Sequence, residues 1–108
     1  MIYCLQSKLG EPIKIGYTKD KKTLTKRIKS IQTGYPYILN ILCTFNGDIY
    51  LETEIHQRLK SQKLIGEWFK HSNITEGVIC FYYEGKRPPL KFREETRPYF
   101  SDVGIREL

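Results

Sequence analysis

Apolar and polar residues alternate in two short segments near the start of the chain. Residues 1–6 are MIYCLQ and residues 12–18 are PIKIGYT, with Gly10 and Pro12 close to the junction between them. A period of two sends successive side chains to opposite faces of a sheet, so each segment is typical of a half-buried β-strand. Two such strands joined by a loop of about five residues predict a β-hairpin.

The spacing of apolar residues then lengthens, over residues 23–34. The apolar positions there are Leu24, Ile28 and Ile31. Their spacing of i, i+4 and i+7 places them on one stripe of an amphipathic helix. Asp20 or Thr23 is suited to cap the start of this helix, and Gly34 follows its end.

The same two patterns recur over residues 37–62. β-Branched and aromatic residues in the segment 37–47 predict a third strand. Asp48 then caps a second helix, whose apolar stripe consists of Leu51, Ile55 and Leu59. Glu52 and His56 are also four residues apart, so they lie side by side at the margin between core and solvent.

The elements together predict an α+β fold in two layers. GEWF at residues 66–69 is a short extended or turning piece, and Asn73 with Glu76 resembles a capping box ahead of a third helix at VICFYY. The order strand, strand, helix, strand, helix, helix favours a small three-stranded antiparallel sheet flanked by helices. We expect one domain over residues 1–84 and a C-terminal extension or tail over residues 85–108, where aliphatic residues are few.

Composition places the chain among single globular domains. It has 108 residues, 40% apolar and 13% aromatic, which excludes a disordered chain by composition. No apolar run approaches the roughly 20 residues of a membrane span, and the first residues lack the pattern of a signal peptide. We expect a cytoplasmic protein with no membrane partner.

The three cysteines do not form a metal or disulfide pattern. Cys4, Cys43 and Cys80 are odd in number, widely spaced and flanked by apolar residues. We interpret them as reduced core residues, and zinc is not supported.

The positive charge is concentrated in one segment. The chain carries +6 overall, and residues 14–29 alone hold seven Lys and Arg against one Asp, which is again +6. The basic residues are Lys14, Lys19, Lys21, Lys22, Lys26, Arg27 and Lys29. Such a segment favours a polyanionic partner, with nucleic acid first and an anionic membrane surface second. The alternative is a helix face that only keeps the protein in solution.

Four polar residues are candidates for chemistry. By strand alternation, Tyr3 and Lys14 share the sheet face opposite the isoleucines, and a cation there is expected to lower the pKa of the phenol toward that of a general base. Arg27 offers a planar fork for a phosphate, and Glu52 offers a carboxylate in a basic neighbourhood. From the residues alone, Tyr3 also fits an ordinary strand aromatic and Glu52 an exposed helical glutamate.

This set suits one-metal phosphodiester cleavage better than other hydrolytic schemes. It contains a base, a cation for the transition state and one carboxylate for Mg²⁺, which keeps several waters when bound to protein. It lacks the paired carboxylates of a two-metal site and a Ser-His-Asp arrangement.

Five elements in order then carry a family resemblance. The segments IYCLQ, KIGYT, Arg27, LETEIH and GEWF, over about residues 1–70, resemble the signature of the GIY-YIG nuclease family, in the short branch common in phages and viruses. The resemblance implies a compact three-stranded fold and metal-dependent hydrolysis of DNA. For a viral protein it would act in the host cytoplasm or nucleus.

The resemblance assigns roles to individual residues. Tyr3 matches the tyrosine of the first motif, the base or its relay, and Lys14 stands where the second motif usually has tyrosine. Arg27 matches the family arginine and Glu52 the metal-binding glutamate. Tyr17 matches a position near the phosphate.

Other positions agree less closely with the family. His56, Glu67 and Trp68 belong to the pattern of this branch, and we weigh His56 as either a catalytic residue or a packed, hydrogen-bonded one. We expect Trp68 and Phe69 to close the core. Met1 stands where the family has glycine, which leaves the strand end free to fray. The asparagine that follows the glutamate in many relatives has no clear counterpart.

These observations lead to one function and two alternatives. The first is an endonuclease that needs Mg²⁺ or Mn²⁺, with Tyr3 and Lys14 activating water. Its DNA-backbone contacts would be Lys19, Lys21, Lys22, Lys26 and Lys29. The second is an inactive binding module on the same fold, accessory to a larger complex. The third is a protein-binding factor that uses a tyrosine-rich surface formed by Tyr35, Tyr37, Tyr82, Tyr83 and Tyr99. Because the core has no separate DNA-reading domain, we expect a homodimer or a specificity subunit.

Overall fold

A four-stranded antiparallel sheet forms the centre of the structure, a computed structural model that describes residues 1–86 and residue 88. The strands are β1 (Ile2–Gln6), β2 (Ile13–Tyr17), β3 (Asn40–Phe45) and β4 (Trp68–Phe69), in the spatial order β3-β1-β2-β4. The sequence predicts the first three, and the fourth is the extended piece in GEWF. It pairs with β2 through only two positions, Ile13 with Phe69 and Lys14 with Trp68.

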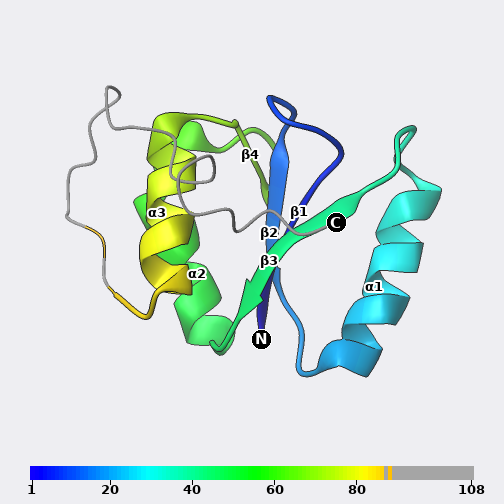
Figure 1. Ribbon diagram of the computed structural model, residues 1–108, viewed down its shortest axis with the longest axis horizontal. Coiled ribbons are helices and arrows are strands. Elements are labelled where there is room, and N and C mark those ends of the chain that lie inside the picture. Colours follow the sequence, from blue (N-terminus) through cyan, green and yellow to red (C-terminus); the bar gives the residue numbers. More distant parts are fainter. Residues whose placement is uncertain (87, 89–108) are drawn as a thin grey trace.

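Helices lie on both faces of this sheet (Figure 1). Helix α1 (Lys21–Thr33) covers one face, while α2 (Ile49–Arg58) and α3 (Asn73–Tyr83) cover the other. A 3-10 turn at Lys60–Gln62 follows α2, so that helix ends earlier than the residue spacing indicates. The α+β class and the element order predicted from sequence are confirmed.

The apolar stripes and caps explain where the helices form. The Asp20 carboxylate accepts a hydrogen bond from the Thr23 N–H at 2.8 Å, and the Asp48 carboxylate accepts one from the Leu51 N–H at the same distance. Both side chains therefore satisfy amide groups that a helix start leaves unpaired. Gly34 ends α1 as expected.

The predicted capping box of the third helix is wrong. Ser72, not Asn73, precedes α3 and accepts the Thr75 N–H at 3.2 Å. Glu76 is almost fully buried, and its Oε1 lies 3.1 Å from His71 Nε2. The charge pattern of the sequence could not show this, because the histidine lies outside the helix, five residues before the glutamate.

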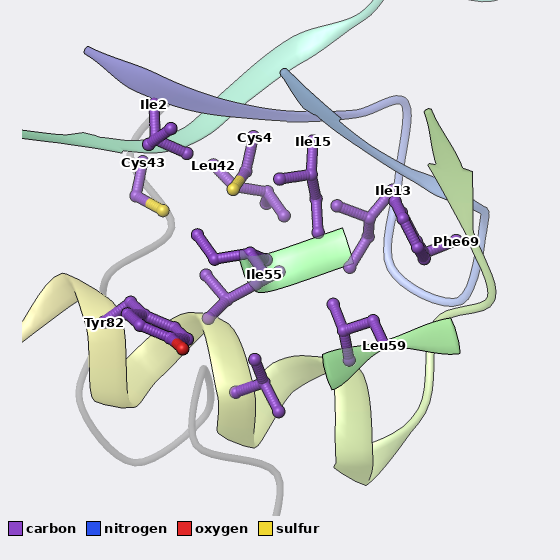
Figure 2. Packing of buried hydrophobic residues seen from close by; sticks show 12 residues of the cluster. Ile2, Cys4, Ile13, Ile15, Leu42, Cys43, Ile55, Leu59, Phe69 and Tyr82 are labelled. Carbon is purple, nitrogen blue, oxygen red and sulfur yellow. The ribbon is translucent and has the colours of Figure 1, made fainter. Parts of the chain in front are cut away.

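Alternation divides the strand side chains between two apolar clusters. The larger cluster lies between the sheet and α2 and α3 and includes Ile2, Cys4, Ile13, Ile15, Leu42, Ile55, Leu59 and Phe69 (Figure 2). The smaller cluster lies under α1 and consists of Tyr3, Leu5 and Leu24, with Met1, Ile28 and Ile31 packed against it. Phe69 thus closes the core as expected, whereas Trp68 is only partly buried and belongs to the opposite face.

The start of the chain is held in place. The Thr18 N–H donates to the Met1 carbonyl at 2.9 Å, and the Met1 nitrogen donates to the carbonyls of Thr18 and Gly47 at 2.8 Å each. The expected fraying of this strand end is therefore wrong, because backbone groups from two other segments bind it.

The remaining expectations on composition have mixed outcomes. Cys4, Cys43 and Cys80 are free and buried, as predicted. Among the described residues, no helix has both the length and the apolar character needed to cross a membrane. The expected extension over residues 85–108 lies outside the described residues, apart from Gly85, Lys86 and Pro88.

Candidate active site at the open edge of β2

Because β4 is short, the edge of β2 that faces away from β1 has a strand partner only at Ile13 and Lys14. Beyond the two paired positions, Ile15 N–H donates to the Glu67 carbonyl at 3.0 Å. The Ile15 carbonyl accepts from His56 Nε2 at 2.9 Å, and the Tyr17 N–H donates to the Glu52 carboxylate. Two side chains one turn apart on α2 therefore satisfy backbone groups at the open edge of β2, which fixes their position there.

His56 combines packing with this edge contact. Its ring lies 5.0 Å from that of Phe69, centre to centre. Because Nε2 donates to a carbonyl, that nitrogen carries a proton and Nδ1 is the ring nitrogen able to accept. The structure thus bears out the packed, hydrogen-bonded interpretation, and a catalytic role for His56 stays a prediction.

Glu52 lies in a field of mixed charges. Burial is the largest influence and raises the pKa of its carboxyl, and the neighbouring Glu67 raises the pKa further. His56, the Tyr17 N–H and Arg27 act in the opposite direction. A carboxylate that is partly desolvated and faces a second carboxylate is stabilised by a bound cation.

Tyr3 is fully buried on the α1 face, with its ring over Gly16. A Cβ atom added to Gly16 would lie 2.5 Å from the Tyr3 hydroxyl oxygen, so the glycine of KIGYT is needed for this close approach. The hydroxyl has no hydrogen-bond partner among the described residues. It is therefore a buried polar atom whose hydrogen-bonding capacity is not used by any described residue.

The predicted lowering of the Tyr3 pKa is wrong. Burial raises the pKa of Tyr3 to about 12, and Glu67 raises it as well, while Arg27 has the opposite influence. At neutral pH the side chain is a neutral phenol. The sequence shows the nearby cation but not the loss of water around the buried ring, which has the larger influence on the pKa.

Lys14 shares the face of Tyr3, as predicted, but its charge is directed elsewhere. In the register, Tyr3 is opposite Gly16 and Leu5 is opposite Lys14, so the two polar side chains are diagonal neighbours. The Lys14 ammonium is 3.2 Å from Glu67 Oε1 and 5.4 Å from the centre of the Trp68 ring. The carboxylate and the indole therefore fix the lysine beside the site.

Glu67 is the residue that sequence analysis undervalued. It pairs with Lys14 and influences the pKa of both Tyr3 and Glu52. The sequence signal for its role was its position in GEWF, directly before Trp68, which pairs with Lys14 across the two strands. That signal needed the pairing of β4 with β2, which a two-residue strand does not reveal in sequence.

Arg27 and the lysines lie on or beside α1. Arg27 lowers the pKa of both Tyr3 and Glu52 through its charge, so it lies within electrostatic range of both. The exposed lysines are Lys19, Lys21, Lys22, Lys26 and Lys29. The Tyr17 side chain packs against the larger core cluster instead, and only its backbone contacts Glu52. Ion pairing and electrostatic influence thus link Tyr3, Lys14, Arg27, Glu52 and His56 through Glu67 and Glu52, and a role for the Tyr17 phenol stays a prediction.

The donor set fits a single hard cation. No group of three or more His, Cys, Asp or Glu side chains that could hold a metal occurs among residues 1–86 and 88. Mg²⁺ does not need such a cage, since one or two carboxylates with waters and substrate oxygens suffice. Glu52, with Glu67 nearby, offers that minimal set.

A family model covers most of the chain. Residues 1–80 match the model of the T5orf172 domain. The chain belongs to the T5orf172 domain family. This family is of phage type and is associated with nucleases, including GIY-YIG-like endonucleases. The match therefore confirms that the chain resembles a phage-type, nuclease-associated domain, while membership of the GIY-YIG family itself stays a prediction. Comparison with curated proteins and with solved structures gave no match.

Proposed function

We propose that this T5orf172 domain is a divalent-metal-dependent endonuclease of GIY-YIG type that hydrolyses phosphodiester bonds of DNA. The observation that carries the proposal is the position of Glu52. Its carboxylate is held at the open edge of β2 by the Tyr17 N–H, within the electrostatic reach of Glu67 and Arg27. The same two residues influence the buried Tyr3 hydroxyl, so carboxylates, a guanidinium and a phenol without a partner among the described residues are coupled electrostatically.

Each side chain has a distinct task in this proposal. Glu52 would bind Mg²⁺ or Mn²⁺, which when bound supplies positive charge to the phosphate and the leaving oxygen. Arg27 would bind the non-bridging phosphate oxygens through its planar fork and stabilise the charge that develops there. Tyr3 would hold the attacking water through its neutral hydroxyl, in place of the phenolate expected from sequence.

Lys14 and Glu67 would support this arrangement. Their ion pair of 3.2 Å fixes the ammonium beside Trp68 and the carboxylate beside the site. We infer that Glu67 shares the cation with Glu52, which would relieve the repulsion that raises the pKa of Glu52.

A plasmid-nicking assay tests the catalytic claim. Wild-type protein should nick DNA with Mg²⁺ or Mn²⁺ and stop when EDTA is added. Glu52→Gln should lower the rate by about 10²–10³-fold while DNA binding persists. The matched control is Glu84→Gln, because Glu84 is exposed and ends α3. Protein that binds DNA and never cuts it with any divalent cation would exclude the enzyme.

The basic residues of α1 supply the contact with DNA in this proposal. Exposed lysines along one helix bind phosphates without reading bases. Lys22→Glu with Lys26→Glu should weaken binding and reduce the slope of log Kd against log salt by about two. Lys8→Glu with Lys70→Glu makes the same change of charge at two other exposed positions and should have the smaller effect. Equal losses of DNA affinity in the two double variants would show that the lysines of α1 contribute no more to DNA binding than other exposed lysines.

A DNA-binding module without catalysis is the second candidate. The raised pKa of Tyr3 favours it, since a neutral phenol is a poor base at physiological pH. The nicking assay separates the two functions, because a binding module would show the salt-dependent binding and none of the metal-dependent cleavage.

A further inference from the structure

An apolar pocket opens on the α1 face next to the candidate active site. Its volume is about 340 Å³, within the range of small-molecule sites. The lining residues are Pro12, Ile31, Gly34, Tyr35, Leu64, Ile65 and Trp68. They come from the residue before β2, from the end of α1 with the loop that follows it, and from the turn that leads into β4 with its first residue, three segments that are distant in sequence.

Trp68 links the pocket to the ion pair of Lys14 and Glu67. This indole lies 5.4 Å from the Lys14 ammonium on one side and stacks on Tyr35 at 5.1 Å, with 12° between the ring planes. Lys14 in turn binds Glu67. The pocket and the Lys14–Glu67 pair therefore share one side chain, the Trp68 indole.

Helix geometry places the pocket along the same flank of α1 as the arginine. Arg27, Ile31 and Gly34 are at i, i+4 and i+7, which puts them on one side of the helix. Ile31 is about 6 Å from Arg27 along the helix axis, from a rise of 1.5 Å per residue. A phosphate bound to Arg27 would thus leave its neighbouring base close to the pocket.

The rim of the pocket is apolar and exposed, which is unusual beside so basic a helix. Leu64 is 53% exposed and Ile65 is 76% exposed, in a turn where Gly66 has a φ of 56°. A phosphate has no reason to bind there, whereas a planar uncharged ring gains from contact with aliphatic and aromatic surfaces. The combination of basic flank and apolar pocket fits a nucleotide, with its charge on the helix and its base in the pocket.

We propose that this pocket receives an unpaired nucleobase of the bound DNA strand, next to the phosphate held by Arg27. The inference rests on the proposed DNA substrate and adds a preference to it. Strands with unpaired bases, such as single strands, bulges or flaps, would bind better than a fully paired duplex. The pocket would recognise the π-face of the base and not its sequence.

Trp68 allows a direct test because it is the only tryptophan of the chain. The test titrates the full chain carrying Glu52→Gln with a short single-stranded oligonucleotide and follows tryptophan fluorescence and binding anisotropy. An oligonucleotide of the same length and charge with abasic sites serves as the comparison. We expect the normal strand to change the Trp68 signal and to bind at least about fivefold tighter than the abasic strand.

A pair of surface variants separates the pocket from the rest of the surface. Ile65→Ser removes an apolar contact at the rim, and Ile38→Ser makes the same change at a residue of equal exposure, 78%, outside the pocket lining. Only Ile65→Ser should reduce the difference in binding affinity between the normal and the abasic strand. Both residues are exposed, so folding should be unaffected in each case.

Each outcome of these measurements decides something. Equal affinity for the two strands, with nicking activity present, would overturn the pocket proposal and leave the nuclease intact. Binding of neither strand would contradict the proposed DNA function itself. A Trp68 signal that changes with protein concentration alone would show that a second copy of the chain occupies the pocket, and would also overturn the proposal.

Discussion

The two faces of the sheet use the same strands for different purposes. On the α2 and α3 face, alternate residues of β1 and β2 build a closed apolar core in which Ile2, Cys4, Ile13 and Ile15 are fully buried. On the α1 face, the residues between them include Tyr3, Lys14 and Gly16, and a pocket remains open beside Trp68. One helix covers this second face, so less apolar surface is needed there and polar groups can be placed.

The difference teaches how a short strand pair supports a site. The core face fixes the register of β1 and β2, because a shift by one residue would expose every isoleucine. That register places Tyr3 over Gly16 and fixes Lys14 beside Trp68 on the other face. The stability of one face therefore determines the geometry of the other.

The largest expected contrast lies within α2. Ile55→Ala removes a fully buried side chain of the core face and should cost about 2–5 kcal/mol of unfolding free energy. Cleavage measured below the lowered Tm should survive. Glu52→Gln should have the reverse effect: cleavage is lost, and Tm rises slightly because a partly buried charge repelled by Glu67 is removed. Thermal melts of both variants beside nicking rates check this, and a lowered Tm in Glu52→Gln would contradict it.

Gly16→Ala tests whether the α1 face depends on close packing. The new methyl group would meet the Tyr3 hydroxyl and ring at 2.5–2.9 Å, and the ring cannot move far because it is buried. We expect a loss of about 1–3 kcal/mol in stability and a larger relative loss in cleavage, since Tyr3 is displaced.

The control for Gly16 lies at the margin of the core face. Gly47→Ala would meet the Leu51 and Ile2 side chains at 2.5–2.8 Å. It should also destabilise the protein, but with a smaller effect on the cleavage rate per folded molecule. Equal losses of activity in the two variants would show that the position of Tyr3 does not matter.

Sequence patterns were sufficient for the core face and insufficient for the site. The stripe of Leu51, Ile55 and Leu59 and the alternation around Ile13 and Ile15 predicted the packing, because burial leaves a periodic signal. The site depends instead on pairing between distant segments. No local pattern shows that a two-residue strand brings Glu67 to Lys14, or that the cap of the third helix is Ser72.

The electrostatics of the site were the hardest to predict. The sequence places a cation near Tyr3, and the family resemblance supplies the roles of Arg27 and Glu52. The sequence does not show that the Tyr3 ring is buried or that Glu67 pairs with the Lys14 ammonium. These two facts reverse the direction of the Tyr3 pKa shift.

A double-mutant cycle on Lys14 and Glu67 gives a smaller effect. Lys14→Met should reduce the cleavage rate about tenfold, and DNA binding by less, because the lysine is only partly exposed and engaged with Glu67. Glu67→Gln should have a similar effect. If the two residues act as a pair, the double variant loses little more than either single variant. If the fold-losses of the two single variants multiply in the double variant, Lys14 and Glu67 act independently. Equal losses of cleavage rate and DNA affinity in Lys14→Met would make Lys14 a phosphate contact.

The last contrast appears only in alkali and compares one tyrosine from each face. The pKa values of Tyr3 and Tyr82 are both raised to about 12, in each case mainly by burial. A raised pKa means that the folded protein holds its proton more tightly, so stability is fully present below pH 10 and falls as the pH rises toward 12. Each tyrosine should account for a loss on the order of 2 kcal/mol across that range.

Replacement by phenylalanine should remove that alkaline loss but have different effects at neutral pH. The Tyr82 hydroxyl donates to Glu54, so Tyr82→Phe should cost about 1.5–3 kcal/mol at pH 7. The Tyr3 hydroxyl has no partner among the described residues, so Tyr3→Phe should be neutral or stabilising there while cleavage falls. Denaturant unfolding of both variants between pH 7 and pH 11 measures this. A clear loss of stability in Tyr3→Phe at pH 7 would mean that the hydroxyl supports the fold. That result would contradict the proposal that the hydroxyl binds substrate or the attacking water.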